Sequence, residues 1–203
     1  ATFSRVFTLD NRGRGLSSGG PDLSYRLADY ADDTAGLIRS LALESPVVLG
    51  HSMGGRIVIK LAATDPEVVG RLILADPPVS GPGRRPYPIP LAWYLEGIDS
   101  AARGEPMPVA GSLLANWTEE QLALRAEWLP TCDSTAIAES YRSFDDEDIH
   151  SLMPSIKCPT YLICADNGGT ITPEEEREIV RLIDGCRSTR IPDVGHMIPW
   201  DDL

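Results

Sequence analysis

The stretch VVLGHSMGG, residues 47–55, joins an apolar run to a tight glycine-rich turn that contains a serine. The apolar run predicts a buried strand, and the helical spacing of apolar residues over 54–63 predicts a helix directly after the turn. A serine in the pattern G-x-S-x-G between a strand and a helix is typical of a nucleophile, because the strained turn lifts its hydroxyl above the sheet. We therefore expect Ser52 to act as a nucleophile and the backbone N–H of Met53 to bind an oxyanion.

Strand-like and helical segments alternate along most of the chain. The predicted strands are residues 5–9, 46–50, 71–75, 159–165 and 188–191, and the predicted helices are residues 27–41, residues 54–63 and a segment that begins at Pro173. Strands that alternate with helices imply a parallel sheet covered by helices. The sequence therefore predicts an α/β fold with a mostly parallel sheet.

The middle of the chain interrupts this alternation. Residues 76–90 are too rich in proline and glycine to form a regular element, and the following residues up to 152 show short helical patterns with aromatic residues and no strand. We interpret this part as a helical insertion that caps the sheet. The predicted domains are an α/β core made of residues 1–82 and 153–203 and a helical cap or lid made of residues 83–152.

Composition limits the kind of partner. The 203 residues carry a formal net charge of −12, which disfavours nucleic acid and anionic membranes and makes a small molecule the expected ligand. No apolar run approaches the roughly 20 residues of a membrane-spanning helix. The four cysteines show no C-x-x-C pair and no metal-ligand spacing, which favours reduced thiols in a cytoplasmic protein. The oligomeric state stays open.

Three motifs together resemble those of the α/β-hydrolase family. They are the serine turn at 50–54, the run DNRGRGLS at 10–17, which is similar to the family's D-x-R-G-x-G-x-S loop, and the pair Gly195-His196 near the end of the chain. The resemblance extends over essentially the whole chain. It implies an α/β-hydrolase fold with a helical cap, and a triad of serine, histidine and a carboxylate.

A serine hydroxyl needs a base that takes its proton, and the sequence contains three histidines. His51 lies inside the serine turn and is expected to point away from the hydroxyl, while His150 lies in the helical insertion. His196 follows the last predicted strand, which is where the family carries its base. We therefore expect His196 to be the catalytic base.

Two aspartates qualify as the acid of the triad. Asp166 follows the strand at 159–165, where most of the family carries its acid, but it lies one or two residues early. Asp76 follows the strand at 71–75, and an aspartate there is also a common turn former before two prolines. The run DPPVSGPGRR at 76–85 resembles bacterial deformylases of nicotinate breakdown, in which the acid follows this earlier strand. This narrower resemblance favours Asp76.

The deformylase resemblance implies a reaction. It is hydrolysis of N-formylmaleamate to maleamate and formate, without a metal or an organic cofactor. An acidic protein needs local positive charge to bind this small anionic amide, and Arg84 and Arg85 are candidates that could instead be solvated loop residues. Arg12 and Arg14 are weaker candidates, because an arginine in that loop commonly ties the loop together.

Two other functions fit the same motifs. A carboxylesterase or a carbon–carbon bond hydrolase would use the same Ser52 and His196. A non-catalytic protein of this fold would bind a ligand through its cap.

The beginning of the chain departs from the family pattern. The predicted strand at 5–9 corresponds to the family's fourth strand, so the N-terminal strands are apparently missing, including the third strand, whose following loop supplies the second oxyanion donor. We therefore expect the 203 residues to be a fragment of a chain of roughly 250 residues or more.

Overall fold

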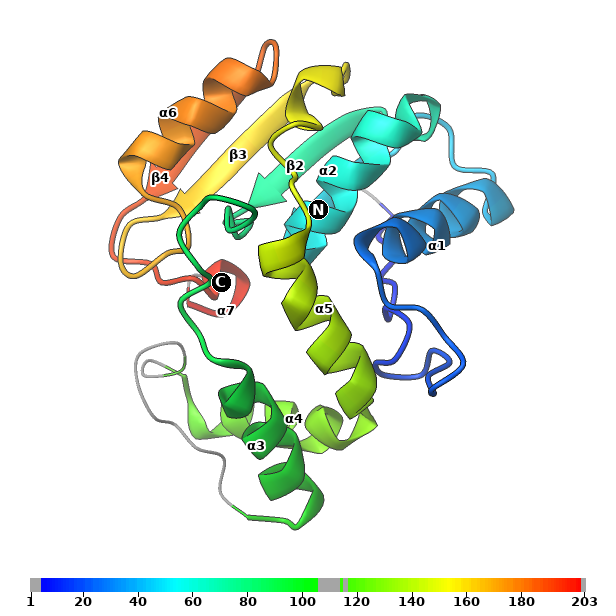
Figure 1. Ribbon diagram of the computed structural model, residues 1–203, viewed down its shortest axis with the longest axis vertical. Coiled ribbons are helices and arrows are strands. Elements are labelled where there is room, and N and C mark those ends of the chain that lie inside the picture. Colours follow the sequence, from blue (N-terminus) through cyan, green and yellow to red (C-terminus); the bar gives the residue numbers. More distant parts are fainter. Residues whose placement is uncertain (1–4, 106–113, 115–116, 202–203) are drawn as a thin grey trace.

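A computed structural model describes residues 5–105, 114 and 117–201 (Figure 1). Its sheet has four parallel strands in the order β1-β2-β3-β4. The strands are β1 (Val47–His51), β2 (Arg71–Ala75), β3 (Thr160–Ala165) and β4 (Arg187–Ile191). The predicted α/β fold with a parallel sheet is therefore confirmed.

The two faces of the sheet differ in burial. On one face Leu72, Leu74 and Leu162 are buried in the core together with Ile57 of α2 and Ile179 of α6. Leu74 lies opposite Leu162 in the β2–β3 register, so this face forms a continuous apolar layer. On the other face the side chains of Leu49 and Tyr161 are 58% and 40% exposed. The described helices therefore bury one face of the sheet more fully than the other.

Three helices that contribute side chains to the buried core lie close to their predicted positions. They are α1 (Leu27–Ser40), α2 (Met53–Thr64) and α6 (Pro173–Leu182). In α6, Pro173 occupies the first turn, and the Thr172 and Glu175 side chains form a capping box that satisfies backbone N–H groups at the helix start. Local chemistry thus fixes where this helix begins.

The predicted strand at residues 5–9 is wrong. Residues 5–9 form no strand, and the side chains of Val6 and Phe7 are 78% and 43% exposed. A strand is stable only when its backbone groups pair with a neighbour. In the described part of the chain the only strand paired with β1 is β2, so residues 5–9 have no ladder to join.

Three further helices lie between β2 and β3, namely α3 (Leu91–Ala102), α4 (Glu119–Trp128) and α5 (Ser134–Asp146). Figure 1 shows α3 and α4 apart from the sheet, with α5 running back toward it. The short elements are the 3₁₀ turns Pro66–Val68, Leu129–Thr131 and Met153–Ser155 and the helix α7 (Ile198–Asp201). None of the helices in the described ranges is long and apolar enough to span a membrane.

One fully buried arginine joins the core to this helical layer. Arg56 in α2 donates hydrogen bonds to the carbonyls of Pro78 (3.0 Å) and Ser80 (2.8 Å), in the loop after β2. Its other terminal nitrogen donates to the carbonyls of Ser143 (2.9 Å) and Glu147 (2.7 Å), at the end of α5. Burial lowers the pKa of Arg56 to about 10, so the guanidinium stays charged at neutral pH. A single side chain thus fixes two remote segments to α2.

We expect Arg56→Lys to lower the free energy of unfolding by about 3 kcal/mol, because one ammonium group cannot serve both pairs of carbonyls and buried polar groups would lose their partners. Urea unfolding followed by circular dichroism measures this loss. Arg39→Lys is the matched control, since Arg39 is exposed and pairs with Asp65, and its effect should stay within about 0.5 kcal/mol. Equal losses in the two variants would contradict the role of Arg56.

A second prediction concerns His150, whose two ring nitrogens are buried without a hydrogen-bond partner in the described chain. Burial, reinforced by nearby Arg84, lowers the pKa of His150 to about 4, below the usual 6.5. Between pH 6.5 and about 4 the unfolded chain therefore binds a proton that the folded protein does not. The free energy of unfolding consequently decreases as the pH is lowered through this range. We expect a loss of about 3 kcal/mol in the free energy of unfolding over this range.

We expect His150→Gln to have a correspondingly flatter stability profile, because glutamine does not titrate. Urea unfolding at pH 7 and at pH 4.5 would measure the slope in both proteins. Parallel profiles would show that His150 does not cause the acid sensitivity.

Candidate active site

The serine turn has the geometry that its glycines allow. Ser52 lies between β1 and α2 with φ 54° and ψ −123°, a conformation that is strained for a residue with a side chain. A Cβ atom on Gly50 would lie 2.2 Å from the carbonyl oxygen of Gly54, and one on Gly55 would lie 2.7 Å from Cβ of Pro77. Only glycine fits at these two positions. Gly50 is the first glycine of the motif G-x-S-x-G, and Gly55 directly follows the second, Gly54, where an added Cβ atom would meet no atom within 4 Å.

His196 reaches the serine from the loop after β4. Its Nε2 atom lies 2.9 Å from Oγ of Ser52, and its Nδ1 atom lies 2.7 Å from Oδ2 of Asp76. His196 and Asp76 are both buried. The three residues that the sequence predicted as nucleophile, base and acid therefore form one continuous chain of hydrogen bonds.

The Asp76 carboxylate is fully buried and surrounded by donors. Besides His196, its Oδ2 atom accepts hydrogen bonds from the backbone N–H (2.7 Å) and the hydroxyl (3.1 Å) of Thr170, and its Oδ1 atom accepts one from the N–H of Ala165 at 3.3 Å. These donors hold the carboxylate in place beside the imidazole. Asp166, the other candidate, is exposed, and its backbone N–H donates to Ile191. The structure thus brings Asp76 to the imidazole and leaves Asp166 outside.

His51 does not contact the serine hydroxyl but supports the histidine loop. Its Nε2 atom lies 2.7 Å from the carbonyl oxygen of His196, and the two rings are 5.0 Å apart. Burial and the neighbouring His196 lower the pKa of His51, which favours its neutral form. Neutral His51 donates to the His196 carbonyl and adds no positive charge beside the base. No local pattern predicts this contact, because 145 positions separate the two residues.

The N–H of Met53 begins α2, directly behind Ser52. The first N–H groups of a helix have no intrahelical acceptor, and the helix dipole adds partial positive charge there. A negative oxygen that formed beside Ser52 would be stabilised at this position. A hydroxyl, a base and an oxyanion donor that lie side by side are the groups that an acyl-transfer reaction requires. In the described residues no group of three or more His, Cys, Asp and Glu side chains could hold a metal ion.

The two arginines predicted to contact the substrate are paired with α6. Arg84 donates to both carboxylate oxygens of Glu178, and Arg85 donates to both oxygens of Glu175. Arg85 also donates to the carbonyl of Thr170, the residue whose N–H and hydroxyl bind Asp76. These contacts fit a structural role in which Arg85 steadies the loop that surrounds the acid.

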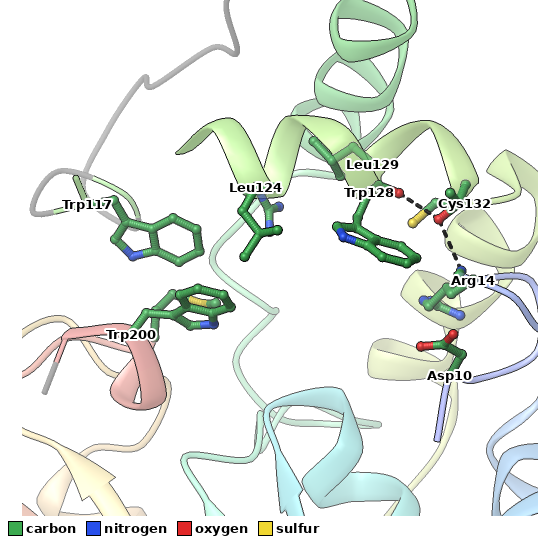
Figure 2. A pocket seen from close by; sticks show the side chains of 12 residues that line it. Asp10, Arg14, Trp117, Leu124, Trp128, Leu129, Cys132 and Trp200 are labelled. Atoms are coloured by element: carbon green, nitrogen blue, oxygen red, sulfur yellow. Dashed lines mark hydrogen bonds between the residues drawn. The ribbon is translucent and has the colours of Figure 1, made fainter. Parts of the chain in front are cut away.

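A pocket of about 430 Å³ lies between α4 and the catalytic loops (Figure 2). Met197, the neighbour of His196, lines it, and so does Arg14, whose Nη2 contacts Sδ of Met53 at 3.6 Å. Ser52 and His196 do not line the pocket themselves, but each is next in the chain to a residue that lines it or contacts its lining. Trp117 and Trp200 form a stacked pair in its wall. Sequence reasoning did not identify Arg125, which also lines the pocket, because no motif marks a cation on the cap.

Comparison with known proteins gives matches over most of the chain. A family model described as alpha/beta hydrolase fold matches residues 4–203. The chain is 45% identical over 198 residues to N-formylmaleamate deformylase of Pseudomonas putida, which covers 98% of this chain and 74% of that protein. A crystal structure of a serine-to-alanine variant of N-formylmaleamic acid deformylase from Pseudomonas putida S16 matches with a TM-score of 0.87 and 46% identity, over 94% of this chain and 75% of that one. A stretch of 71 residues is 44% identical to 2-(acetamidomethylene)succinate hydrolase of Mesorhizobium japonicum, covering 35% of this chain and 25% of that protein.

The hydrogen-bond chain predicts which aspartate activates the serine. Asp76→Asn should slow labelling of Ser52 by a fluorophosphonate probe about 10⁴-fold, because an amide stabilises the wrong imidazole tautomer. Asp166→Asn should label at a rate within about twofold of the unmodified protein, since exposed Asp166 does not contact the imidazole. Labelling rates measured by mass spectrometry, on variants whose circular dichroism matches the parent, decide the point. Slow labelling of Asp166→Asn together with fast labelling of Asp76→Asn would reverse the assignment.

Proposed function

Because the chain belongs to the α/β-hydrolase family and is a homologue of N-formylmaleamate deformylase, we propose that it hydrolyses N-formylmaleamate to maleamate and formate. The observation that carries the proposal is the chain of hydrogen bonds from Ser52 through His196 to Asp76, with lengths of 2.9 and 2.7 Å. The catalytic roles of these residues are part of the same proposal. The chemistry uses neither a metal nor an organic cofactor.

The first half of the reaction forms a formyl-enzyme. The Ser52 hydroxyl attacks the formyl carbon while Nε2 of His196 takes its proton. Asp76 accepts the other imidazole N–H and stabilises the imidazolium that forms. The negative oxygen of the tetrahedral intermediate accepts a hydrogen bond from the N–H of Met53.

Collapse of the intermediate breaks the carbon–nitrogen bond. The imidazolium of His196 gives its proton to the nitrogen, and maleamate leaves with the electron pair of the broken bond in its N–H group. This nitrogen is bonded to a second carbonyl, which delocalises its charge and makes it a better leaving group than an ordinary amine. His196 then activates a water molecule, which attacks the formyl ester of Ser52 and releases formate.

The proposed substrate is a small anionic amide, and we expect the reaction to take place in the cytoplasm. All four cysteines are free thiols, as in proteins of a reducing compartment. The pocket beside the catalytic residues has a volume of about 430 Å³, within the range of sites for small molecules. Its wall includes the stacked rings of Trp117 and Trp200, which offer an apolar surface to a bound substrate.

We expect the enzyme to release formate from N-formylmaleamate and Ser52→Ala to lose this activity by a factor on the order of 10⁶. Formate is measured with a coupled formate dehydrogenase assay. Ser52→Ala lacks only one oxygen atom, so equal melting temperatures would show that the loss is chemical. Hydrolysis of short acyl esters without formate release would identify a carboxylesterase instead. Absence of both activities together with slow fluorophosphonate labelling would favour a non-catalytic ligand-binding protein.

A further inference from the structure

The pocket has two electrostatically different ends. Figure 2 shows Asp10 and Arg14 at one end and the stacked rings of Trp117 and Trp200 at the other. Arg14 already donates to the hydroxyls of Tyr30 (2.8 Å) and Ser140 (3.1 Å), and the Asp10 carboxylate lines the same end of the pocket. At this end, therefore, the guanidinium of Arg14 is already engaged in hydrogen bonds, and the carboxylate of Asp10 repels an anion.

The other end contains buried donors without acceptors. Arg125 of α4 lines the pocket with its guanidinium 5.4 Å from the ring centre of Trp93 and 5.9 Å from that of Trp117. Its Nε atom is buried without a hydrogen-bond partner in the described residues, and so is Nε1 of Trp117. No carboxylate in the described chain lies within salt-bridge distance of Arg125.

Two unpartnered donors in one pocket point to a missing acceptor. A buried cation is costly until an anion compensates it, and a buried N–H without an acceptor carries a similar penalty. Desolvation lowers the pKa of Arg125, in agreement with a guanidinium that lacks a counter-ion. By contrast, Arg12, Arg84 and Arg85 all pair with carboxylates of this chain. Arg125 is therefore available to a ligand in a way that these three arginines are not.

We propose that the guanidinium of Arg125 and the indole N–H of Trp117 form a carboxylate-binding subsite, which holds the carboxylate of the substrate while its formyl group lies at Ser52. This inference rests on the proposed function and names the residues that select an anionic amide. The planar fork of an arginine matches the two oxygens of a carboxylate. The rings of Trp93 and Trp117 keep the fork in place and reduce its contact with water.

Steady-state kinetics with two substrates test the subsite. One substrate is N-formylmaleamate, and the other is its neutral analogue, in which a carboxamide replaces the carboxylate. We expect Arg125→Gln to raise KM for the anion about 30-fold or more and to change KM for the neutral analogue less than about threefold. Trp117→Phe, which keeps a ring beside Arg125 and removes the N–H, should raise KM for the anion about tenfold.

Arg142→Gln is the matched control, because Arg142 is an exposed arginine of the helical layer outside the pocket, and its kinetics should equal those of the parent. Binding of maleamate to Ser52→Ala, measured by titration calorimetry with and without Arg125→Gln, tests the same subsite without turnover. There we expect Arg125→Gln to weaken binding about 30-fold.

The two measurements separate this inference from the proposed function. If the parent enzyme releases formate but Arg125→Gln keeps the preference for the anion, the subsite is wrong and the function stands. If no formate is released but maleamate binds to Ser52→Ala in a manner that depends on Arg125, the subsite stands and the function fails. If Ser52→Ala does not bind maleamate at millimolar concentration, the subsite is overturned.

Discussion

The buried guanidinium of Arg56 is the contact on which the arrangement of the site depends. It lies in α2, four residues after Ser52, and its hydrogen bonds hold both the loop that follows Asp76 and the end of α5. The relative positions of the nucleophile, the acid and the helical layer therefore depend on this one guanidinium. A neutral side chain of the same size would remove the hydrogen bonds that Arg56 donates to the carbonyls of Pro78, Ser80 and Glu147, and an unpaired buried carbonyl is costly.

The acid is held by a second set of contacts, which extends outward to the surface. Thr170 donates two hydrogen bonds to Asp76, the Thr170 carbonyl accepts one from Arg85, and Arg85 is paired with Glu175 of α6. Arg85 thus orients Thr170, and Thr170 orients Asp76, in the way that outer residues support the inner residues of a preorganised site. The loops after β2, β3 and β4, which carry Asp76, Thr170 and His196, are thereby joined around one imidazole.

Local features of the sequence predicted local features of the structure. The serine turn was predictable because glycines, strand and helix are adjacent in the chain, and α6 was predictable from its capping residues. The choice between Asp76 and Asp166 could not be made from the residues alone, because it depends on which loop reaches His196, 120 positions away from Asp76. The strand predicted at 5–9 failed for the same reason, since strand pairing is a long-range property. Arg125 and Trp117 meet only through tertiary packing.

The distribution of charge limits how this acidic protein would bind the proposed anionic substrate. Its 30 acidic residues exceed its 18 basic ones, and several arginines near the site are neutralised by carboxylates of the same chain. Binding of the proposed anion would therefore require a cation that the fold leaves uncompensated, with apolar walls that reduce its contact with water. Arg125 has these walls, and it belongs to the helical layer and not to the sheet. If Arg125 binds the substrate as proposed, substitutions in this layer would change the substrate while Ser52, His196 and Asp76 remained as they are, and chemistry and specificity would be encoded in separate parts of the chain.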